Sequence, residues 1–258
     1  MRRPFIASIS GKGGTGKTTL TALLLKVLID NATDDTILVV DADPATNLPE
    51  VLGVNINKTI GDIVEEFRKK SNNISDLGFE KSSLLQYWIL RDSLTETPHF
   101  DLIAMGRGEG EGCYCYVNSI LTRILVELMK NYSVVLMDME AGLEHLSRRV
   151  DRYVNTLIVV VDPSIMSIKT AERIITIAKE VNIKPEKLFL VGNRMSENTV
   201  REVARYASQL GYEYAGTIPN DDVIYTYNLE GKSLLTLPQN TKAIQATRII
   251  AKNIGLID

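Results

Sequence analysis

Continuous apolar runs alternate along the chain with segments whose apolar residues recur at helical spacing. The runs are rich in leucine and β-branched residues, which is typical of strands that are buried on both faces. The predicted strands are residues 5–10, 36–41, 101–105, 134–138, 156–162, 187–192 and 213–218. The predicted helices are residues 18–29, 117–130, 169–181, 199–210 and 241–254. This alternation predicts an α/β fold, a doubly wound and mostly parallel sheet with helices on both faces.

Residues 58–97 interrupt the alternation because their apolar spacing is less regular. Their first part, residues 60–67, has its apolar residues on one side of a helix and is predicted to be amphipathic. The chain has 258 residues and shows no linker, so we expect a single P-loop domain over residues 1–258. Residues 58–97 are then an insertion at one edge of the sheet.

A glycine-rich loop follows the first predicted strand. Its sequence fits the phosphate-binding pattern G-x-x-x-x-G-K-[ST] and reads Gly11-Lys12-Gly13-Gly14-Thr15-Gly16-Lys17-Thr18-Thr19. Glycines let the backbone turn tightly and point N–H groups at phosphate oxygens, and the following helix adds the positive end of its dipole. Lys17 reaches the β- and γ-phosphates in this pattern, and the Thr18 hydroxyl is a ligand of Mg²⁺. A strand before the motif and a helix after it favour this interpretation over a chance glycine turn, so we expect ATP or ADP to bind here with Mg²⁺.

Lys12 is an additional cation directly after the first glycine of this loop. In this respect the loop resembles the deviant Walker A motif of the ParA, MinD, ArsA and nitrogenase iron-protein ATPases. The resemblance implies a MinD-like fold and a nucleotide-switched homodimer that hydrolyses ATP. Lys12 would cross the dimer interface to the partner's nucleotide, in the way that an arginine finger does. A solvated loop lysine is the alternative interpretation.

Acidic residues end two of the predicted strands, at the edge where open α/β sheets bind ligands. Asp41 and Asp43 lie two positions apart, so both leave their strand on the same side. Asp138 begins the string D-M-E-A-G at residues 138–142 and has the position of a Walker B carboxylate that serves Mg²⁺. The resemblance implies that Asp43 positions the attacking water, that Asp41 supports the Mg²⁺ site through water, and that Gly142 approaches the γ-phosphate. Family members usually have threonine where Met139 stands, and an ordinary strand-end turn is the alternative for the two aspartates of residues 41–43.

Two further strand ends carry a possible base-binding site. Asn193 and Arg194 close one predicted strand, and Pro219 follows another. In the family that this chain resembles, an asparagine with a basic residue at this strand end contacts adenine, and a proline segment stacks on the base. Ordinary turn chemistry is the alternative.

Cys113 and Cys115 are the two cysteines of the chain, and they end a glycine-rich loop. In an extended segment residues i and i+2 face the same side, so both sulfur atoms could bind one soft metal ion. A tetrahedral thiolate site takes four ligands, which two copies of the chain would supply. Two alternatives stay open: small buried cysteines, and a vicinal disulfide that a reducing cytosol disfavours.

The whole set of motifs resembles CooC-type ATPases over nearly the full chain. The resemblance is carried by the phosphate-binding loop, the string D-A-D-P at residues 41–44, the string at residues 138–142 and the string G-C-Y-C-Y at residues 112–116. CooC-type proteins are nickel-insertion accessory proteins of carbon monoxide dehydrogenase, and the similar AcsF-type proteins serve acetyl-CoA synthase. The resemblance implies that Cys113 and Cys115 bind nickel or zinc between two subunits. It also implies that one of these two enzymes is the client.

Other functions fit the same motifs less fully. A proline expected around residues 108–111 is missing, which leaves the choice of client open. The rival functions are a MinD/ParA-type partitioning ATPase and an iron–sulfur or metal carrier for another client. The two histidines, His99 and His145, are predicted to be structural or surface residues.

Charge and composition narrow the function further. The net charge is −3, from 29 Lys and Arg against 32 Asp and Glu, whereas a dedicated nucleic-acid binder usually has a basic excess. No stretch approaches the roughly 18 consecutive apolar residues of a membrane span. Two cysteines do not make the disulfide framework of a secreted protein. We therefore expect a cytoplasmic protein without a nucleic-acid or membrane partner.

Overall fold

The computed structural model describes residues 4–32, 34–70, 79–107, 115–140, 154–180 and 185–258. Its strands are β1 (Phe5–Gly11), β2 (Ile37–Asp41), β3 (Leu94–Glu96), β4 (Asp101–Ala104), β5 (Val134–Asp138), β6 (Thr156–Val161), β7 (Lys187–Asn193) and β8 (Glu213–Ile218). They form an eight-stranded sheet in the order β3-β4-β2-β5-β1-β6-β7-β8. β3 pairs with β4 in antiparallel fashion, and the other neighbours are parallel. All seven predicted strands are present, and the predicted fold class is confirmed.

The central strands are buried on both faces because their apolar residues are continuous. Every residue of β2 and β6 is buried. Successive side chains of a strand point to opposite faces. In β2, Ile37 and Val39 therefore belong to one core of the protein, while Leu38 and Val40 belong to another. An alternating apolar and polar strand would have left one face of the sheet open to water.

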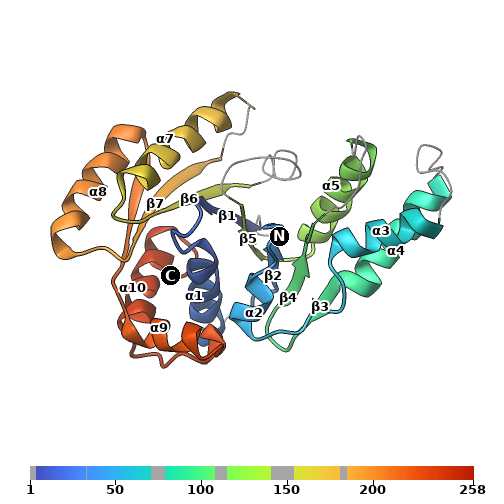
Figure 1. The fold of residues 1–258 in the computed structure, drawn as a ribbon, viewed down its shortest axis with the longest axis horizontal. Helices are drawn as coiled ribbons and strands as arrows, with labels where there is room; N and C mark the ends of the chain where they lie inside the picture. The colour runs from blue at the N-terminus through green and yellow to red at the C-terminus, as the bar shows by residue number, and fades with distance from the viewer. Residues whose placement is uncertain (1–3, 33, 71–78, 108–114, 141–153, 181–184) are drawn as a thin grey trace.

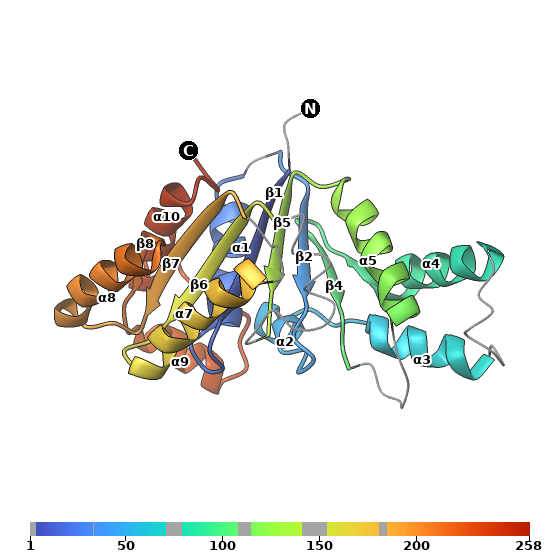
Figure 2. The ribbon, with the colours of Figure 1, turned by 90° about the horizontal axis from the view of Figure 1, so that it is seen from above.

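Helices cover both faces of the sheet, as Figures 1 and 2 show. One face carries α1 (Lys17–Asp30), α2 (Leu48–Leu52), α9 (Asp222–Leu229), the 3₁₀ helix η3 (Leu234–Thr236) and α10 (Lys242–Asn253). The other face carries α3 (Ile60–Lys70), α4 (Phe79–Ser93) and α5 (Cys115–Met129) over β2, β4 and β5, and α7 (Ile165–Glu180) and α8 (Glu197–Leu210) over β6 and β7. The five predicted helices are all present. None of the helices among the described residues is long and apolar enough to cross a membrane.

The irregular segment at residues 58–97 contains one predicted helix and two elements that the sequence did not reveal. The amphipathic helix expected at residues 60–67 is α3, whose buried side includes Ile60, Ile63 and Phe67. The additional elements are α4 and the edge strand β3. Phe67 packs edge-on against Trp88 of α4, with ring centroids 5.5 Å apart, so the two helices share one apolar contact.

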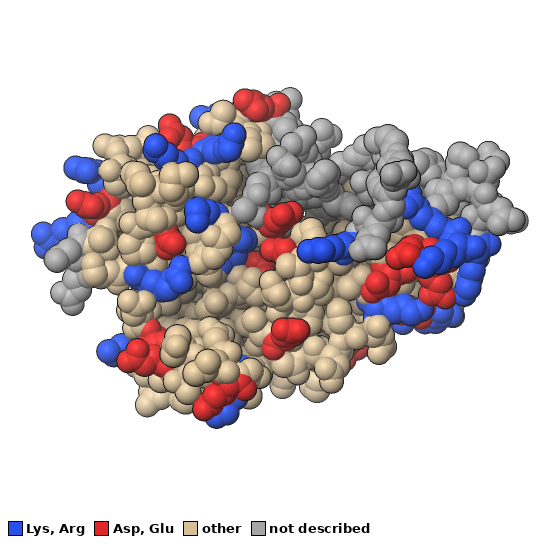
Figure 3. Space-filling view, viewed as in Figure 1, with Lys and Arg blue, Asp and Glu red and all other residues tan. Residues whose placement is uncertain are grey.

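The outer surface of α3 and α4 carries charges of both signs. Glu66 pairs with Lys58 (2.5 Å) and Lys70 (2.8 Å), and Glu65 pairs with Lys69 (2.7 Å). Figure 3 shows these basic and acidic side chains interspersed at the right of the molecule. Because the pairs are exposed to solvent, they contribute little to the stability of the fold.

Helix α1 lies directly behind the glycine-rich loop, and its apolar residues are buried on all sides. Leu20, Leu23, Leu24 and Leu25 have no exposed surface. A helix that is buried on all sides cannot shift without opening the core. The first residues of α1 therefore present a fixed frame to any ligand of the loop.

Replacement of Leu24 by alanine should lower the free energy of unfolding by about 2–5 kcal/mol, because the change leaves a cavity between α1 and the sheet. The matched control is Leu229→Ala, since Leu229 is also a helical leucine but is 75% exposed. The control should change the free energy of unfolding by less than about 0.5 kcal/mol. Urea denaturation of the two variants measures the difference, and equal losses would contradict the buried position of α1.

Candidate functional site

The glycine-rich loop lies between β1 and α1, as the sequence predicts. β1 ends at Gly11 and α1 begins at Lys17. A tight turn closes the loop, because the backbone N–H and the hydroxyl of Thr15 both donate to the Lys12 carbonyl oxygen, at 3.2 Å and 2.8 Å. Gly13 and Gly14 are exposed at the crown of the loop, and Lys17 is buried at its end. The loop therefore exposes its backbone to solvent, while Lys17 is buried in the interior of the site.

Asp138 lies at the centre of the sheet edge next to this loop. It is the last residue of β5, 1% exposed, and in register with Ile9 of β1 on one side and Asp41 of β2 on the other. Among the described residues, neither of its carboxylate oxygens has a hydrogen-bond partner of standard geometry. A buried carboxylate without a partner is costly unless a cation or a proton neutralises it.

The surroundings of Asp138 show that the predicted residues converge. Burial, with a smaller contribution from the charges of Asp41 and Asp43, raises the pKa of its carboxyl group to about 7. The Thr18 hydroxyl and the Lys17 ammonium lie close enough to lower it. Residues from three separate stretches of the chain therefore lie near enough to Asp138 to act on its carboxyl group.

The Asp41 carboxylate also binds the backbone of the segment that follows β2. One of its carboxylate oxygens accepts a hydrogen bond from the N–H of Asp43 (3.1 Å), and the other accepts one from the N–H of Leu48 (3.0 Å). Burial raises the pKa of Asp41 to about 6 in spite of these bonds. The Asp43 carboxylate accepts from the N–H of Ala45 (2.9 Å) and is only half-buried. Asp41 thus fixes the start of the segment that carries Asp43.

This arrangement fits a hard divalent cation. Mg²⁺ binds oxygen ligands and retains several waters. The orphaned carboxylate of Asp138 and the hydroxyl of Thr18 supply oxygen ligands at the end of the phosphate-binding loop, and Asp41 stands one strand away. The donor set therefore agrees with the Mg²⁺ site that the sequence predicts.

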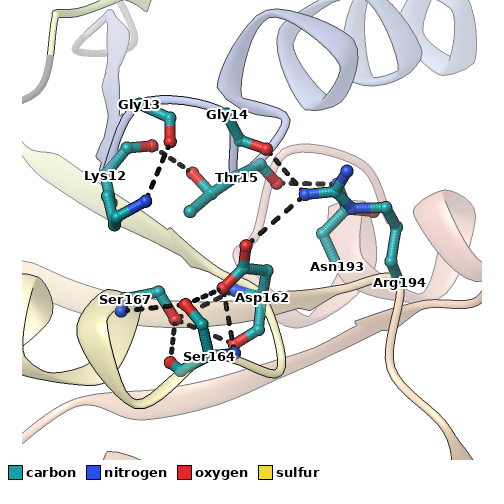
Figure 4. A network of polar contacts seen from close by, with 9 residues as sticks. All are labelled: Lys12, Gly13, Gly14, Thr15, Asp162, Ser164, Ser167, Asn193 and Arg194. Atoms are coloured by element: carbon teal, nitrogen blue, oxygen red, sulfur yellow. Dashed lines mark hydrogen bonds and ion pairs between the residues drawn. The ribbon is translucent and has the colours of Figure 1, made fainter.

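Asn193 and Arg194 contact the phosphate-binding loop itself, as Figure 4 shows. The side-chain amide of Asn193 donates to the Thr15 carbonyl oxygen (2.7 Å), and the guanidinium of Arg194 donates to the Gly14 carbonyl oxygen (2.6 Å). Pro219 follows β8 next to this pair, because Asn193 is in register with Ile218. The structure therefore brings the three residues of the predicted adenine site together, and their contact with a base stays a prediction.

Two of the predicted residues, Gly142 and Cys113, lie outside the described residues. Cys115 is the first residue of α5. The sequence led us to expect both cysteines in an extended segment, and this is wrong for Cys115, because the helix begins two residues earlier than predicted. Within the described part of the chain, no group of three or more His, Cys, Asp or Glu side chains could hold a metal ion.

The start of the cysteine-containing loop is bound to two elements of the nucleotide site and its surroundings. The N–H of Met105 donates to the carbonyl oxygen of Asp41 (2.8 Å), and its carbonyl oxygen accepts from the N–H of Gly61 at the start of α3 (2.9 Å). Gly106 has a φ of +64°, and a Cβ there would lie 2.3 Å from the Thr59 hydroxyl. The loop therefore leaves the sheet through a close-packed junction between β2 and α3.

Sequence reasoning missed Asp162, Ser164 and Ser167. Asp162 accepts hydrogen bonds from the N–H (3.1 Å) and the hydroxyl (2.5 Å) of Ser164, and it lies 3.5 Å from the Arg194 guanidinium. Ser167 donates to the Asp162 carbonyl oxygen (2.8 Å) and closes the first turn of α7. The string D-P-S after a strand is a helix-start signal that could have located α7 earlier, at residue 165 instead of 169. The link to Arg194 joins residues 32 positions apart and has no local signal.

The fold and the site define a P-loop nucleotide-binding protein. The chain belongs to the CobQ/CobB/MinD/ParA nucleotide-binding domain family, whose pattern matches residues 6–234, and it is an ATPase. An uncharacterized ATP-binding protein of Methanocaldococcus jannaschii is 42% identical over 250 residues, which cover 96% of this chain and 98% of that protein. The carbon monoxide dehydrogenase accessory protein CooC of Rhodospirillum rubrum is 26% identical over 246 residues and 89% of each chain.

Solved structures show the same fold. The septum site-determining protein MinD of Pyrococcus horikoshii, complexed with Mg-ADP, superposes with a TM-score of 0.71 over 97% of this chain and 95% of that chain, at 24% identity. The predicted MinD/ParA family is confirmed by the family match over residues 6–234. The narrower CooC-type assignment is a matter of function and is considered below.

The raised pKa values predict an unusual pH dependence of stability in the absence of nucleotide. Asp138 and Asp41 keep their protons to higher pH in the folded state than in the unfolded chain, so the folded state binds more protons between about pH 4 and 7. Their contribution to the free energy of unfolding is therefore present at low pH and is lost as the pH rises through this window. Asp138→Asn, which cannot ionise, should be more stable than the wild type at pH 8 by roughly 2–4 kcal/mol.

Urea denaturation at a series of pH values measures this difference between the two proteins. Asp222→Asn, a change on the exposed side of α9, is the control and should run parallel to the wild type. A difference between Asp138→Asn and the wild type that stays constant from pH 4 to 8 would contradict the prediction.

Proposed function

We propose that this chain is a nucleotide-switched ATPase that carries nickel or zinc on Cys113 and Cys115 of two subunits. We further propose that it assists nickel insertion into carbon monoxide dehydrogenase or acetyl-CoA synthase. Similarity to CooC of Rhodospirillum rubrum over 89% of the chain supports the class of client. The observation that carries the proposal is the junction at Asp41, where the nucleotide site and the root of the cysteine-containing loop meet.

The nucleotide site has a part for each group of Mg-ATP. The N–H groups of the loop and Lys17 bind the phosphates, and Asn193, Arg194 and Pro219 lie where adenine would be bound. Thr18 and Asp138 hold Mg²⁺, with Asp41 supporting the site. Mg²⁺, when bound, neutralises charge on the β- and γ-phosphates.

Asp43 and Lys12 complete the reaction from opposite sides. Asp43 is half-buried and its charge acts on the Asp138 carboxyl group, which supports a role for Asp43 in orienting the attacking water. The ammonium of Lys12, within the described residues, makes only a long contact of 3.5 Å with the Gly13 carbonyl oxygen. Its own loop therefore gives it no strong partner, which supports a role at the nucleotide of a second subunit.

Asp41 couples the nucleotide site to the cysteine-containing loop. Its side chain holds the N–H of Asp43, and its carbonyl oxygen holds the N–H of Met105. Met105 in turn is bound to Gly61 of α3. A displacement of Asp43 on hydrolysis is thus transmitted to the start of the loop that leads to Cys113.

The two cysteines suit a metal cargo that must be released. Four thiolates from two subunits would complete a tetrahedral site, and such sites accept zinc, nickel and copper(I). A site shared between subunits opens when the dimer opens, so cargo release follows from nucleotide hydrolysis.

A partitioning ATPase of the MinD/ParA type is the second candidate function. The observation in its favour is the close overall agreement with MinD complexed with Mg-ADP, at a TM-score of 0.71. Such a switch needs the same nucleotide site and no thiolates. An iron–sulfur or metal carrier for another client is a third candidate, and the metal content of the purified protein separates the three.

Two lysine substitutions test the ATPase site. Lys17→Ala should lower the hydrolysis rate by about 10²-fold or more, because it removes the cation that neutralises the transferred phosphoryl group. Lys12→Gln should keep ATP binding but lose both hydrolysis and ATP-dependent dimerisation. Light scattering with ADP and with a slowly hydrolysed ATP analogue measures the dimer fraction. Normal dimerisation and hydrolysis in Lys12→Gln would exclude a role in the partner's site.

The metal proposal predicts one nickel or zinc ion per two chains. Cys113→Ser and Cys115→Ser should each abolish binding, because either change removes two of the four thiolates. Elemental analysis beside the dimer fraction measures the stoichiometry, and affinity should fall at acidic pH because thiolates bind metal and thiols do not. One ion per chain, or an ion retained in either variant, would refute the shared site. An ATPase that binds no such metal would favour the partitioning function.

A further inference from the structure

The turn between β7 and α8 holds the phosphate-binding loop from outside. We propose that Asn193 and Arg194 are positioning residues that fix two peptide groups of this loop, so that the N–H of Gly16 faces the phosphates and the N–H of Thr15 keeps the turn of the loop closed. This role is separate from a contact with adenine, and it does not depend on metal carriage. It rests only on the binding of a nucleoside triphosphate by the loop.

The hydrogen bonds act on two successive peptide groups at the crown of the loop. Asn193 donates to the Thr15 carbonyl oxygen (2.7 Å), and Arg194 donates to the Gly14 carbonyl oxygen (2.6 Å). The described peptide bonds are all trans, and in a trans peptide group the C=O and the following N–H point in opposite directions. Drawing these two oxygens towards β7 therefore turns the N–H of Gly16 the other way, towards the inside of the loop. It turns the N–H of Thr15 towards the Lys12 carbonyl oxygen, to which it donates (3.2 Å).

Asn193 sits directly against the loop backbone. It is 6% exposed, and a Cβ at position 16 would lie 2.1 Å from its amide nitrogen. Gly16 also has a φ of +94°, which side chains rarely adopt. Glycine is therefore required at this position by the approach of Asn193 as well as by the turn.

Arg194 is itself held in place by three elements. Its backbone has a φ of +55°, a left-handed conformation that is unfavourable for a non-glycine residue. Its N–H donates to the Ile218 carbonyl oxygen of β8 (2.9 Å), and its guanidinium lies 3.5 Å from the Asp162 carboxylate. Asp162 is fixed in turn by the N–H and hydroxyl of Ser164 at the start of α7. Figure 4 shows the side chain of Arg194 between Asp162 and the loop.

The chemical consequence is a loop shaped before the ligand arrives. N–H groups that already face the phosphates need no reorganisation on binding, and this increases affinity for the phosphate chain whatever base is attached. A contact with adenine acts only on ligands that carry adenine. The two roles therefore differ in their effect on inorganic tripolyphosphate, which has the phosphate chain and no base.

The test measures Mg-ATP directly and Mg-tripolyphosphate by competition with a fluorescent ATP analogue, up to millimolar concentration. Asn193→Ala and Arg194→Ala should each weaken both ligands by the same factor, roughly 3–10-fold, as expected for one lost hydrogen bond. Asn228→Ala and Arg201→Ala replace exposed residues of the same types in α9 and α8, and both should bind like the wild type. If Asn193→Ala does not fold, Arg194→Ala still decides, because its side chain is 51% exposed.

Asp162→Asn separates positioning from simple attraction of phosphate to a cation. If Arg194 acts only by attracting phosphate, removal of the Asp162 negative charge should tighten tripolyphosphate binding. If Asp162 holds Arg194 in position, the same change should weaken tripolyphosphate binding by roughly 2–3-fold. Tripolyphosphate affinities equal to the wild type in Asn193→Ala and Arg194→Ala would overturn the proposal and leave these residues with adenine. Tighter binding in Asp162→Asn would overturn it for Arg194. If tripolyphosphate does not displace the fluorescent ATP analogue from the wild-type protein, the proposal is also overturned, because the loop would then not bind a phosphate chain without the base.

Discussion

Two buried carboxyl groups on neighbouring strands are the constraint on which the nucleotide site of this protein depends. Asp41 and Asp138 are in register at the carboxyl ends of β2 and β5, and burial raises the pKa of both. Their charges repel each other in a setting that water does not relieve. Binding of a proton or a cation is therefore favoured at this edge of the sheet, and the other groups of the site lie near these two carboxyl groups. Lys17 and Thr18 at the start of α1 face the same point.

The phosphate-binding loop is the counterpart of this acidic centre, and it is held from two sides. On one side α1 is buried among apolar residues and fixes the end of the loop. On the other side Asn193 and Arg194 bind the carbonyl oxygens of its crown. A loop of four glycines would otherwise lose much conformational entropy on ordering. Tertiary contacts thus supply the rigidity that glycine cannot.

Asp41 also connects the nucleotide site to the rest of the fold. Its side chain holds the segment that carries Asp43, and its carbonyl oxygen holds Met105 at the root of the cysteine-containing loop. A nucleotide site of one kind can serve proteins with unlike functions, because function depends on the residues added around it. In this chain the loop carries two cysteines, to which the proposed metal cargo would bind.

The sequence by itself determined the fold class, the phosphate-binding loop and the acidic strand ends. Continuous apolar runs need a sheet buried on both faces, and the glycine pattern lies between a strand and a helix; both signals are local. It did not reveal β3 or α4, and it placed Cys115 in an extended segment although α5 begins there. Only the tertiary structure decided that Arg194 bridges Asp162 and the loop, and that Met105 bonds to Asp41. These contacts join residues far apart in the chain, and their geometry depends on the order of strands in the sheet, which periodicity and motif spacing do not encode.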